Sequence, residues 1–259
     1  MLDPDHKVDL FADETGEGPS ALVLLHGFGG SRHVWDGVRR FLDPSRHILF
    51  YDLPGHGQSL GALGEGAAPQ FAGLVLTDLE RRGIQNAHVV GHSLGGAVAV
   101  LMGLLKPQRI SRLTLLAPGG FGPEINADLL NDLAHAATPE EIAASLHAMA
   151  TPDFDPAAFI ISHMAEERKV PGQLAALGVL LSRIVREGRQ GAFTPEQLAS
   201  LIMPVALVWG ELDPVLPAFQ AENAPPSFNL VRQSGSGHML PLEAPEAMAH
   251  LISMVDILP

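Results

Sequence analysis

Cysteine is absent from the sequence, and basic residues are few. Without cysteine, the chain can form neither disulfides nor metal sites with thiolate ligands. The 16 Lys and Arg residues are outnumbered by 29 Asp and Glu residues, which gives a formal net charge of −13. Such a charge would repel a phosphate backbone, so we expect no nucleic-acid partner.

The sequence also shows no pattern typical of a secretory signal or of a membrane span. Residues 1–5 are acidic where a signal peptide is basic, and no apolar stretch of the required length follows them. Residues 87–105 are long enough to resemble a span, but they include two histidines, a serine and four glycines. We therefore expect a cytoplasmic protein with no membrane partner, and the sequence predicts no particular oligomeric state.

Short apolar runs recur along the chain, and most are followed by a segment of helical character. They are continuous in Val, Leu and Ile rather than alternating with polar residues, which is typical of strands buried on both faces. The pattern predicts an α/β fold with a mostly parallel sheet and helices on both faces. The runs are residues 21–25, 47–53, 87–90, 112–116, 205–209 and 229–232.

Helices are expected between these runs, at residues 31–42, 70–82 and 94–105, and a closing helix is expected after the last run, at residues 245–258. Residues 61–69, rich in Gly and Ala, are interpreted as a surface loop or linker. Residues 122–200 interrupt the alternation of strands and helices, because they lack strand-like runs and consist of short amphipathic segments separated by prolines. We predict a core of residues 1–121 and 201–259 and a helical insertion of residues 122–200.

Ser93 is the candidate nucleophile. It is the centre of the motif GHSLG, between the run 87–90 and an apolar helix, which is the context of a nucleophile elbow. The turn must be sharp, and Gly91 and Gly95 remove the Cβ atoms that would collide in it. Because the chain has 27 glycines, the motif alone could arise by chance. Its support comes from the other motifs.

The motif HGFGG directly follows the run 21–25. In α/β folds with a nucleophile elbow, a loop at this position faces the nucleophile. Two backbone N–H groups aimed at the carbonyl oxygen stabilise the negative charge of a tetrahedral intermediate. We expect these N–H groups to belong to Phe28 and Leu94. A purely structural glycine turn is the alternative, and for His26 itself we favour bracing of the loop.

The candidate acid and base follow the last two runs. Asp213, in the motif GELDP, would orient the histidine, and we prefer it to Glu211. His238, in the motif SGHM, would be the general base. The order Ser93, Asp213, His238 is the one found in α/β-hydrolases rather than in chymotrypsin or subtilisin. Asp52, in DLPGHGQS, is expected to organise its loop rather than to act in catalysis.

Taken together, HGFGG, DLPGHGQS, GHSLGG, GELDP and GHMLPLEAP resemble the α/β-hydrolase superfamily, in particular its soluble bacterial esterase, lactonase and carbon–carbon hydrolase branch. The resemblance covers the whole chain except residues 122–200. It implies the α/β-hydrolase fold with a helical cap inserted after strand 6 of the family's sheet, here the run 112–116. It also implies a small-molecule substrate and chemistry that needs no cofactor and no metal.

Single residues separate the chain from some branches of the superfamily. Ser93 stands where dehalogenases and epoxide hydrolases carry Asp, and Ala97 stands where similar menaquinone-pathway enzymes typically carry Arg. The segment from HGFGG to DLPGHGQS is also similar to the hydrolase-like domain of acetoin dehydrogenase acyltransferase components. Nothing before it reads as a lipoyl domain, so a free-standing hydrolase is expected.

The expected activity is hydrolysis of a carboxylic ester, or thioester, of a small and mainly apolar substrate through an acyl-enzyme on Ser93. Hydrolysis of a carbon–carbon bond or of a lactone by the same triad is the first alternative. A ligand receptor with slow turnover is the second.

The cap should supply the pocket. Its apolar candidates are Phe121, Met149, Phe154, Phe159, Met164 and Leu180, although each could instead pack the cap's own core. The cap also carries a group of cations, which we interpret as a solvated face, with pairing to a substrate carboxylate as the alternative. They are Arg168, Lys169, Arg183, Arg186 and Arg189. His135, His147 and His163 lack a metal-binding spacing such as HExxH.

Overall fold

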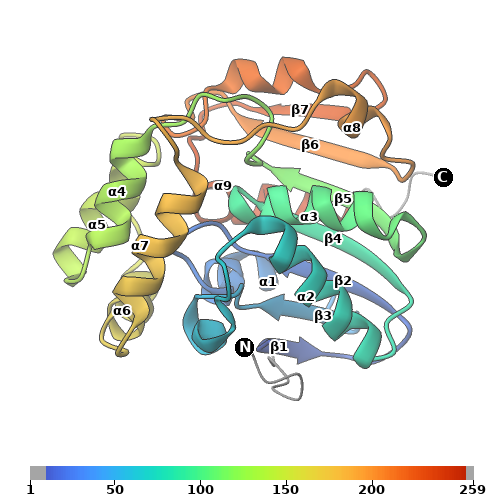
Figure 1. Ribbon diagram of the computed structural model, residues 1–259, viewed down its shortest axis with the longest axis horizontal. Helices are drawn as coiled ribbons and strands as arrows, with labels where there is room; N and C mark the ends of the chain where they lie inside the picture. The colour runs from blue at the N-terminus through green and yellow to red at the C-terminus, as the bar shows by residue number, and fades with distance from the viewer. Residues whose placement is uncertain (1–9, 255–259) are drawn as a thin grey trace.

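Seven strands form one sheet in the computed structural model, which describes residues 10–254 of the chain (Figure 1). Their order across the sheet is β1-β3-β2-β4-β5-β6-β7, and all neighbours are parallel except β1, which is antiparallel to β3. The strands are β1 (Ala12–Thr15), β2 (Ser20–Leu25), β3 (Ile48–Tyr51), β4 (Asn86–His92), β5 (Ile110–Leu116), β6 (Val205–Gly210) and β7 (Asn229–Gln233).

The six predicted runs correspond to β2 through β7. Burial explains why most of them could be recognised in the sequence, whereas β7, at the edge of the sheet, is largely exposed. In β2, β3 and β4 almost every residue is buried. β1 was not predicted. Its sequence ADET is short and hydrophilic, and the strand lies partly exposed at the edge of the sheet, so it carries no run of apolar residues for a pattern to detect.

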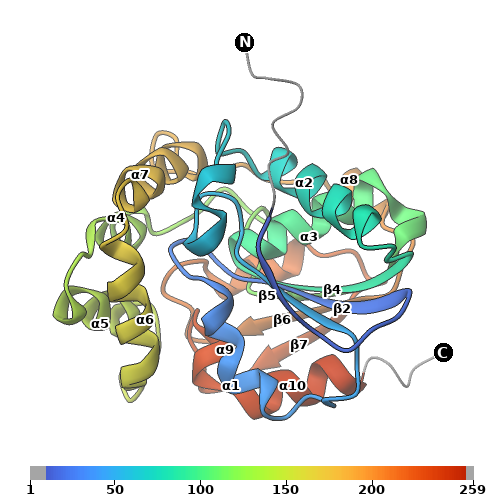
Figure 2. The same ribbon diagram turned by 90° about the horizontal axis from the view of Figure 1, so that it is seen from below.

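Helices cover both faces of the sheet, as predicted (Figure 2). α2 and α3 lie on one face, and α1, α9 and α10 lie on the other. α3 is apolar on almost all sides because it is buried between β4, β5 and α2. The bounds are α1 (Asp36–Arg39), α2 (Ala68–Arg81), α3 (Leu94–Leu105), α9 (Leu240–Glu243) and α10 (Pro245–Met254).

Two predicted boundaries differ from the structure. The helix expected at 31–42 is a 3-10 turn, η1 (Arg32–Trp35), followed by the single turn of α1. α2 begins within the predicted loop 61–69, and a further 3-10 segment, η2 (Gly57–Ala62), overlaps the start of that loop. The last residues of the predicted helix 245–258 lie outside the described residues. The remaining 3-10 turns are η3 (Pro107–Arg109) and η4 (Ala218–Asn223).

Five helices fill the segment between β5 and β6: α4 (Ala127–His135), α5 (Pro139–Ala148), α6 (Ala158–Arg168), α7 (Gln173–Ile184) and α8 (Pro195–Ala199). They follow the fifth of the described strands. Figure 1 shows α4 to α7 beyond the carboxyl ends of the parallel strands, whereas α8 lies away from them, near α3. α4 to α7 are called the cap below.

No helix in the described part of the chain combines the length and the apolar character that crossing a membrane requires.

Candidate active site

Ser93 lies in the turn between β4 and α3, with φ 51° and ψ −114°. A positive φ is strained for any residue other than glycine, and such strain is found mainly at functional sites. The two neighbouring glycines make the turn possible. A Cβ atom at Gly91 would collide with the carbonyl group of Gly95, and one at Gly95 would collide with the carbonyl group of Leu25.

Backbone hydrogen bonds hold this turn from both sides. The N–H of Ser93 donates to the carbonyl oxygen of Leu116 at 3.0 Å, which ties the turn to β5. The carbonyl oxygen of Ser93 accepts from the N–H of Ala97 at 3.1 Å and from that of Gly119 at 3.0 Å. The strained conformation is therefore fixed by its surroundings.

His238 and Asp213 form a buried pair at the ends of the last two strands. Nδ1 of His238 lies 2.8 Å from Oδ2 of Asp213, and their side chains are 2% and 0% exposed. The other carboxylate oxygen, Oδ1, accepts from the N–H groups of Val215 and Leu216, each at 2.8 Å. Glu211, the alternative acid, is exposed. The structure thus brings His238 together with Asp213.

Two contacts that the sequence did not reveal hold the backbone of His238. Its N–H donates to the carbonyl oxygen of Met149, just after α5, at 3.0 Å. Its own carbonyl oxygen accepts from Nε2 of His92 at 2.8 Å. Glu243, within the motif GHMLPLEAP, accepts from the N–H of Gly237 at 2.8 Å and so holds the same loop.

His92 is completely buried, and burial together with the nearby His238 lowers its pKa to about 3. It is therefore neutral at physiological pH. Since Nε2 faces a carbonyl oxygen, the hydrogen of the neutral ring must be on Nε2.

The loop of residues 26–30, called the oxyanion loop below, passes close to the nucleophile. A Cβ atom added at Gly27 would lie 3.2 Å from Cβ of Ser93. Phe28 and Leu94 both line the same cavity as Ser93. Leu94 is the first residue of the 12-residue helix α3, whose N-terminus attracts negative charge. Phe28, which is far from Ser93 in sequence, and Leu94, which directly follows it, thus line one cavity with the candidate nucleophile.

Two neutral histidines brace the oxyanion loop. The N–H of Leu53 donates to Nε2 of His26 at 2.9 Å, and Nδ1 of His26 lies 2.7 Å from the carbonyl oxygen of Gly27. The N–H of Gly29 donates to Nε2 of His56 at 3.1 Å. Burial lowers the pKa of both histidines, which suits the acceptor role of each Nε2. The bracing expected of His26 is present.

Arg168 corrects the interpretation of the cap cations as a solvated face. It is only 5% exposed, and its Nη2 donates to the carbonyl oxygen of Gly29 at 2.9 Å. Its Nε donates to the carbonyl oxygen of Ala136 at 3.3 Å. Burial lowers its pKa to about 10, so the guanidinium is still charged at neutral pH. Arg168 therefore ties the cap to the oxyanion loop.

Asp52 is buried and organises the loop after β3, as expected. Its carboxylate accepts from the backbone N–H and from Nη1 of Arg32, at 2.8 and 2.7 Å, and from the N–H of Gln58 at 3.0 Å.

A cavity of about 550 Å³ lies between the core and the cap. Ser93, His238, Phe28 and Leu94 all contribute to its lining. The cap side is mainly apolar, with Leu130, Leu133, Leu146, Met149 and Met164 among its lining residues. Arg183, Arg186 and Gln190 are among the polar residues that also line the cavity.

Of the six apolar residues proposed for the pocket, Met149 and Met164 line it. Phe121 instead packs against Trp209, with ring centroids 6.0 Å apart, and Leu180 is buried in the hydrophobic core. Phe159 is exposed, and Phe154 packs against the hydrophobic core. The leucines of α4 and α5 were missed because their spacing is that of any amphipathic helix.

Comparison with known proteins decides the family. The model of the alpha/beta hydrolase family matches residues 22–251. The chain belongs to this family. As an alpha/beta hydrolase, it has the fold and the order of motifs that its sequence predicted.

This alpha/beta hydrolase is 32% identical, over 232 residues, to the dihydrolipoyllysine-residue acetyltransferase component of the acetoin cleaving system of Cupriavidus necator. The match covers 88% of the chain but 61% of that relative, so the chain spans about three fifths of the relative's length.

Solved structures share its fold. A variant of the meta-cleavage product hydrolase CumD has a TM-score of 0.82 and 18% identity, with 96% of this chain and 95% of that one covered. The carboxylesterase CesB of Bacillus subtilis has a TM-score of 0.78 and 19% identity, with 95% and 90% covered. At such identities the likeness shows the fold alone.

Proposed function

We propose that the chain is a serine hydrolase that cleaves the carboxylic ester, or thioester, of a small and mainly apolar substrate. The observation that carries this proposal is the buried pair of His238 and Asp213, 2.8 Å apart, with His238 lining the same cavity as the strained Ser93. A base fixed by a buried acid beside a strained serine is the arrangement that activates a hydroxyl nucleophile.

In the first half of the reaction, Nε2 of His238 takes the proton of Ser93 Oγ as that oxygen attacks the ester carbonyl carbon. The carbonyl π electrons move onto the oxygen, where the N–H groups of Phe28 and Leu94 stabilise the negative charge. Asp213 holds the imidazole in place and stabilises its positive charge. The intermediate collapses, the bond to the alcohol breaks, and His238 returns the proton to the departing oxygen.

In the second half, His238 removes a proton from water, which attacks the acyl-enzyme. The acid is released and Ser93 regains its proton from His238. Neither half requires a cofactor or a metal ion.

The cavity supports the choice of substrate. Its volume of about 550 Å³ suits a small molecule, and the leucine and methionine side chains of the cap favour an apolar acyl or alcohol group.

Hydrolysis of a carbon–carbon bond is the second candidate. Arg183 and Arg186 line the cavity wall and could pair with a carboxylate on the substrate, and CumD, which shares the fold, is a meta-cleavage product hydrolase. The same triad would serve this reaction and a lactonase reaction equally.

A substrate panel tests these alternatives. We expect hydrolysis of p-nitrophenyl butyrate, with kcat about 10⁴-fold lower in Ser93→Ala. The panel also includes a neutral lactone and a 2-hydroxy-6-oxo-dienoate ring-fission product, and a far higher kcat/KM on the latter would replace the ester proposal by the carbon–carbon one.

A fluorophosphonate probe separates an enzyme from a receptor. Labelling that disappears in Ser93→Ala supports an activated nucleophile. A stoichiometric burst without turnover on every substrate would favour a receptor instead.

A further inference from the structure

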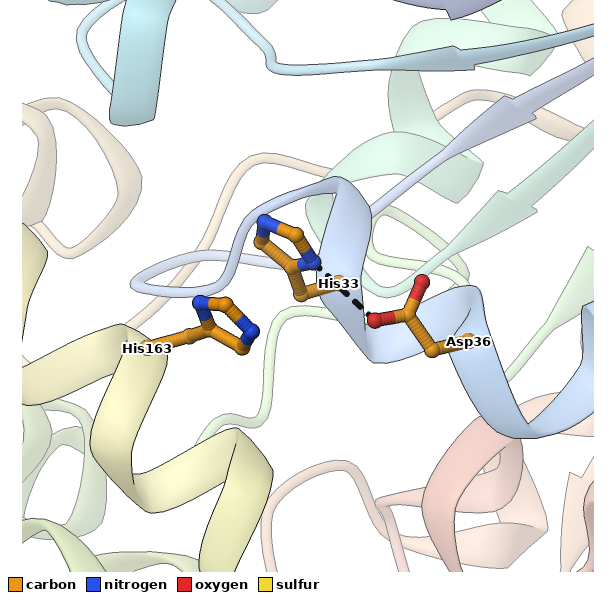
Figure 3. Close-up of side chains that lie close together, drawn as sticks. All are labelled: His33, Asp36 and His163. Carbon is orange, nitrogen blue, oxygen red and sulfur yellow. Dashed lines mark hydrogen bonds and ion pairs between the residues drawn. The ribbon is translucent and has the colours of Figure 1, made fainter.

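A group of three side chains joins the cap to the core outside the cavity. His33 is in η1, Asp36 begins α1, and His163 is in α6 (Figure 3). Their possible ligand atoms all lie within 4.8 Å of one another, and among residues 10–254 this is the one group of three His, Cys, Asp or Glu residues with such spacing. We propose that it binds one divalent transition-metal ion, of the class of Zn²⁺, which clamps the cap to the core.

The three side chains already lie together. The rings of His33 and His163 are stacked, with centroids 3.9 Å apart and planes 1° from parallel. Nδ1 of His33 lies 3.0 Å from Oδ2 of Asp36. Figure 3 shows the two rings face to face, with the carboxylate beside the ring of His33.

Binding requires a modest rearrangement. Zinc holds nitrogen and oxygen ligands at about 2.0 to 2.2 Å, which places tetrahedral ligand atoms roughly 3.3 Å apart. A metal also lies in the plane of each imidazole that binds it, so at least one ring must turn out of the stack. His163 is exposed on α6 and has room to turn, whereas His33 is 19% exposed and less able to move.

The donor set selects the class of metal. Two imidazoles and one carboxylate suit Zn²⁺, Co²⁺ or Ni²⁺, whereas Mg²⁺ and Ca²⁺ prefer oxygen ligands throughout. Asp36 is 35% exposed and His163 is exposed, so water can complete the coordination.

The position of the site determines what a bound metal ion would do to the cap and the core. His33 follows the oxyanion loop by three residues, and the next two residues, Val34 and Trp35, are buried in the core. His163 precedes Met164, which lines the cavity. A bound ion would therefore hold α6 against the part of the core that supports the oxyanion loop. This inference does not depend on the reaction proposed above, because none of the three ligands lines the cavity.

Titration of the metal-free full chain with Zn²⁺ tests the proposal. We expect one ion bound per chain by calorimetry, a visible absorption band when Co²⁺ is used instead, and a higher thermal unfolding midpoint with Zn²⁺. His163→Ala and Asp36→Asn should each weaken Zn²⁺ binding about 100-fold and remove the rise in the midpoint. Circular dichroism would verify that both variants are folded.

His250→Ala is the matched control, because His250 is an exposed histidine on α10, outside the group. It should bind Zn²⁺ as the unaltered chain does. The proposal is overturned if the unaltered chain does not bind Zn²⁺, or if its affinity is the same in His163→Ala and Asp36→Asn.

Discussion

Nε2 of His92 lies 2.8 Å from the carbonyl oxygen of His238, so the residue preceding the proposed nucleophile holds the backbone of the proposed base. The two residues are 146 positions apart in the sequence. Through this contact the turn after β4 and the loop after β7 are fixed relative to each other.

Replacing His92 by Leu should therefore affect both stability and catalysis. The buried carbonyl oxygen of His238 would lose its donor, at a cost of about 1 to 3 kcal/mol in the free energy of unfolding. We expect kcat to fall more than KM rises, because the base is displaced while the pocket is kept. Urea unfolding and steady-state kinetics measure the two effects. His92→Gln, which retains an N–H donor, should restore part of kcat, and equal kinetics for Leu and Gln would contradict this explanation.

Asp213→Asn should lower kcat by about 10³- to 10⁴-fold, because an amide at this position favours the wrong tautomer of His238. Glu211→Gln provides the control, since Glu211 is a nearby acid that is exposed. It should retain nearly full activity in the same p-nitrophenyl ester assay. If Glu211→Gln lost as much activity as Asp213→Asn, the assignment of the acid would be wrong.

Arg168→Met should lower kcat by about 10- to 100-fold with little change in KM. The substitution removes the donor to the carbonyl oxygen of Gly29, and a small displacement of the neighbouring Phe28 N–H is enough to weaken stabilisation of the oxyanion. Lys169→Met is the matched control on the same helix end, because Lys169 makes an exposed ion pair with Glu166. Similar kinetic losses in both variants would show that charge alone, rather than the contact with Gly29, is responsible.

The free energy of unfolding should decrease as the pH falls below about 6.5. Burial keeps His92 neutral in the folded chain down to its pKa of about 3, whereas in the unfolded chain it takes up a proton near its ordinary pKa of 6.5. Between these values the unfolded state binds more protons, so stability falls with decreasing pH by at most about 1.4 kcal/mol per pH unit for this residue.

Burial lowers the pKa of His26 and His56 as well, so they contribute in the same direction. Urea unfolding measured from pH 7.5 down to pH 4.5 checks the slope. His92→Gln should reduce the slope, and a slope that is unchanged in this variant would assign the pH dependence to other groups.

The sheet, and the edge at which the three candidate residues gather, could be predicted because each candidate lies in the turn or loop that follows a predicted strand. Ser93 follows β4, Asp213 follows β6, and His238 follows β7. Because these strands are parallel, the loops after them lie at the same edge of the sheet, the one formed by the carboxyl ends of the strands. The glycines beside Ser93 gave a second signal, since their spacing is required by the turn.

Contacts between the cap and the core were not predictable in this way. Arg168 meets Gly29 across 139 positions, and His33 meets His163 across a similar separation. No motif includes Arg168, His33 or His163, and the motif HGFGG, which includes Gly29, does not indicate a partner in the cap. Arg168 also stands beside the exposed Lys169 in a run of charged residues that looks like a solvated surface. Its burial depends on how α6 packs against the oxyanion loop, which is a property of the tertiary structure.

The bond between the N–H of His238 and the carbonyl oxygen of Met149 limits how this protein can diverge. Because the acceptor is a main-chain atom, this bond restricts the path of the backbone after α5 and does not itself restrict the side chain at position 149. If recombination replaced the cap by that of a relative, the new cap would have to place a backbone carbonyl oxygen at the same point, whichever substrate its pocket binds. Changes of substrate are therefore expected to arise by replacing side chains within the inherited cap more readily than by replacing the cap itself.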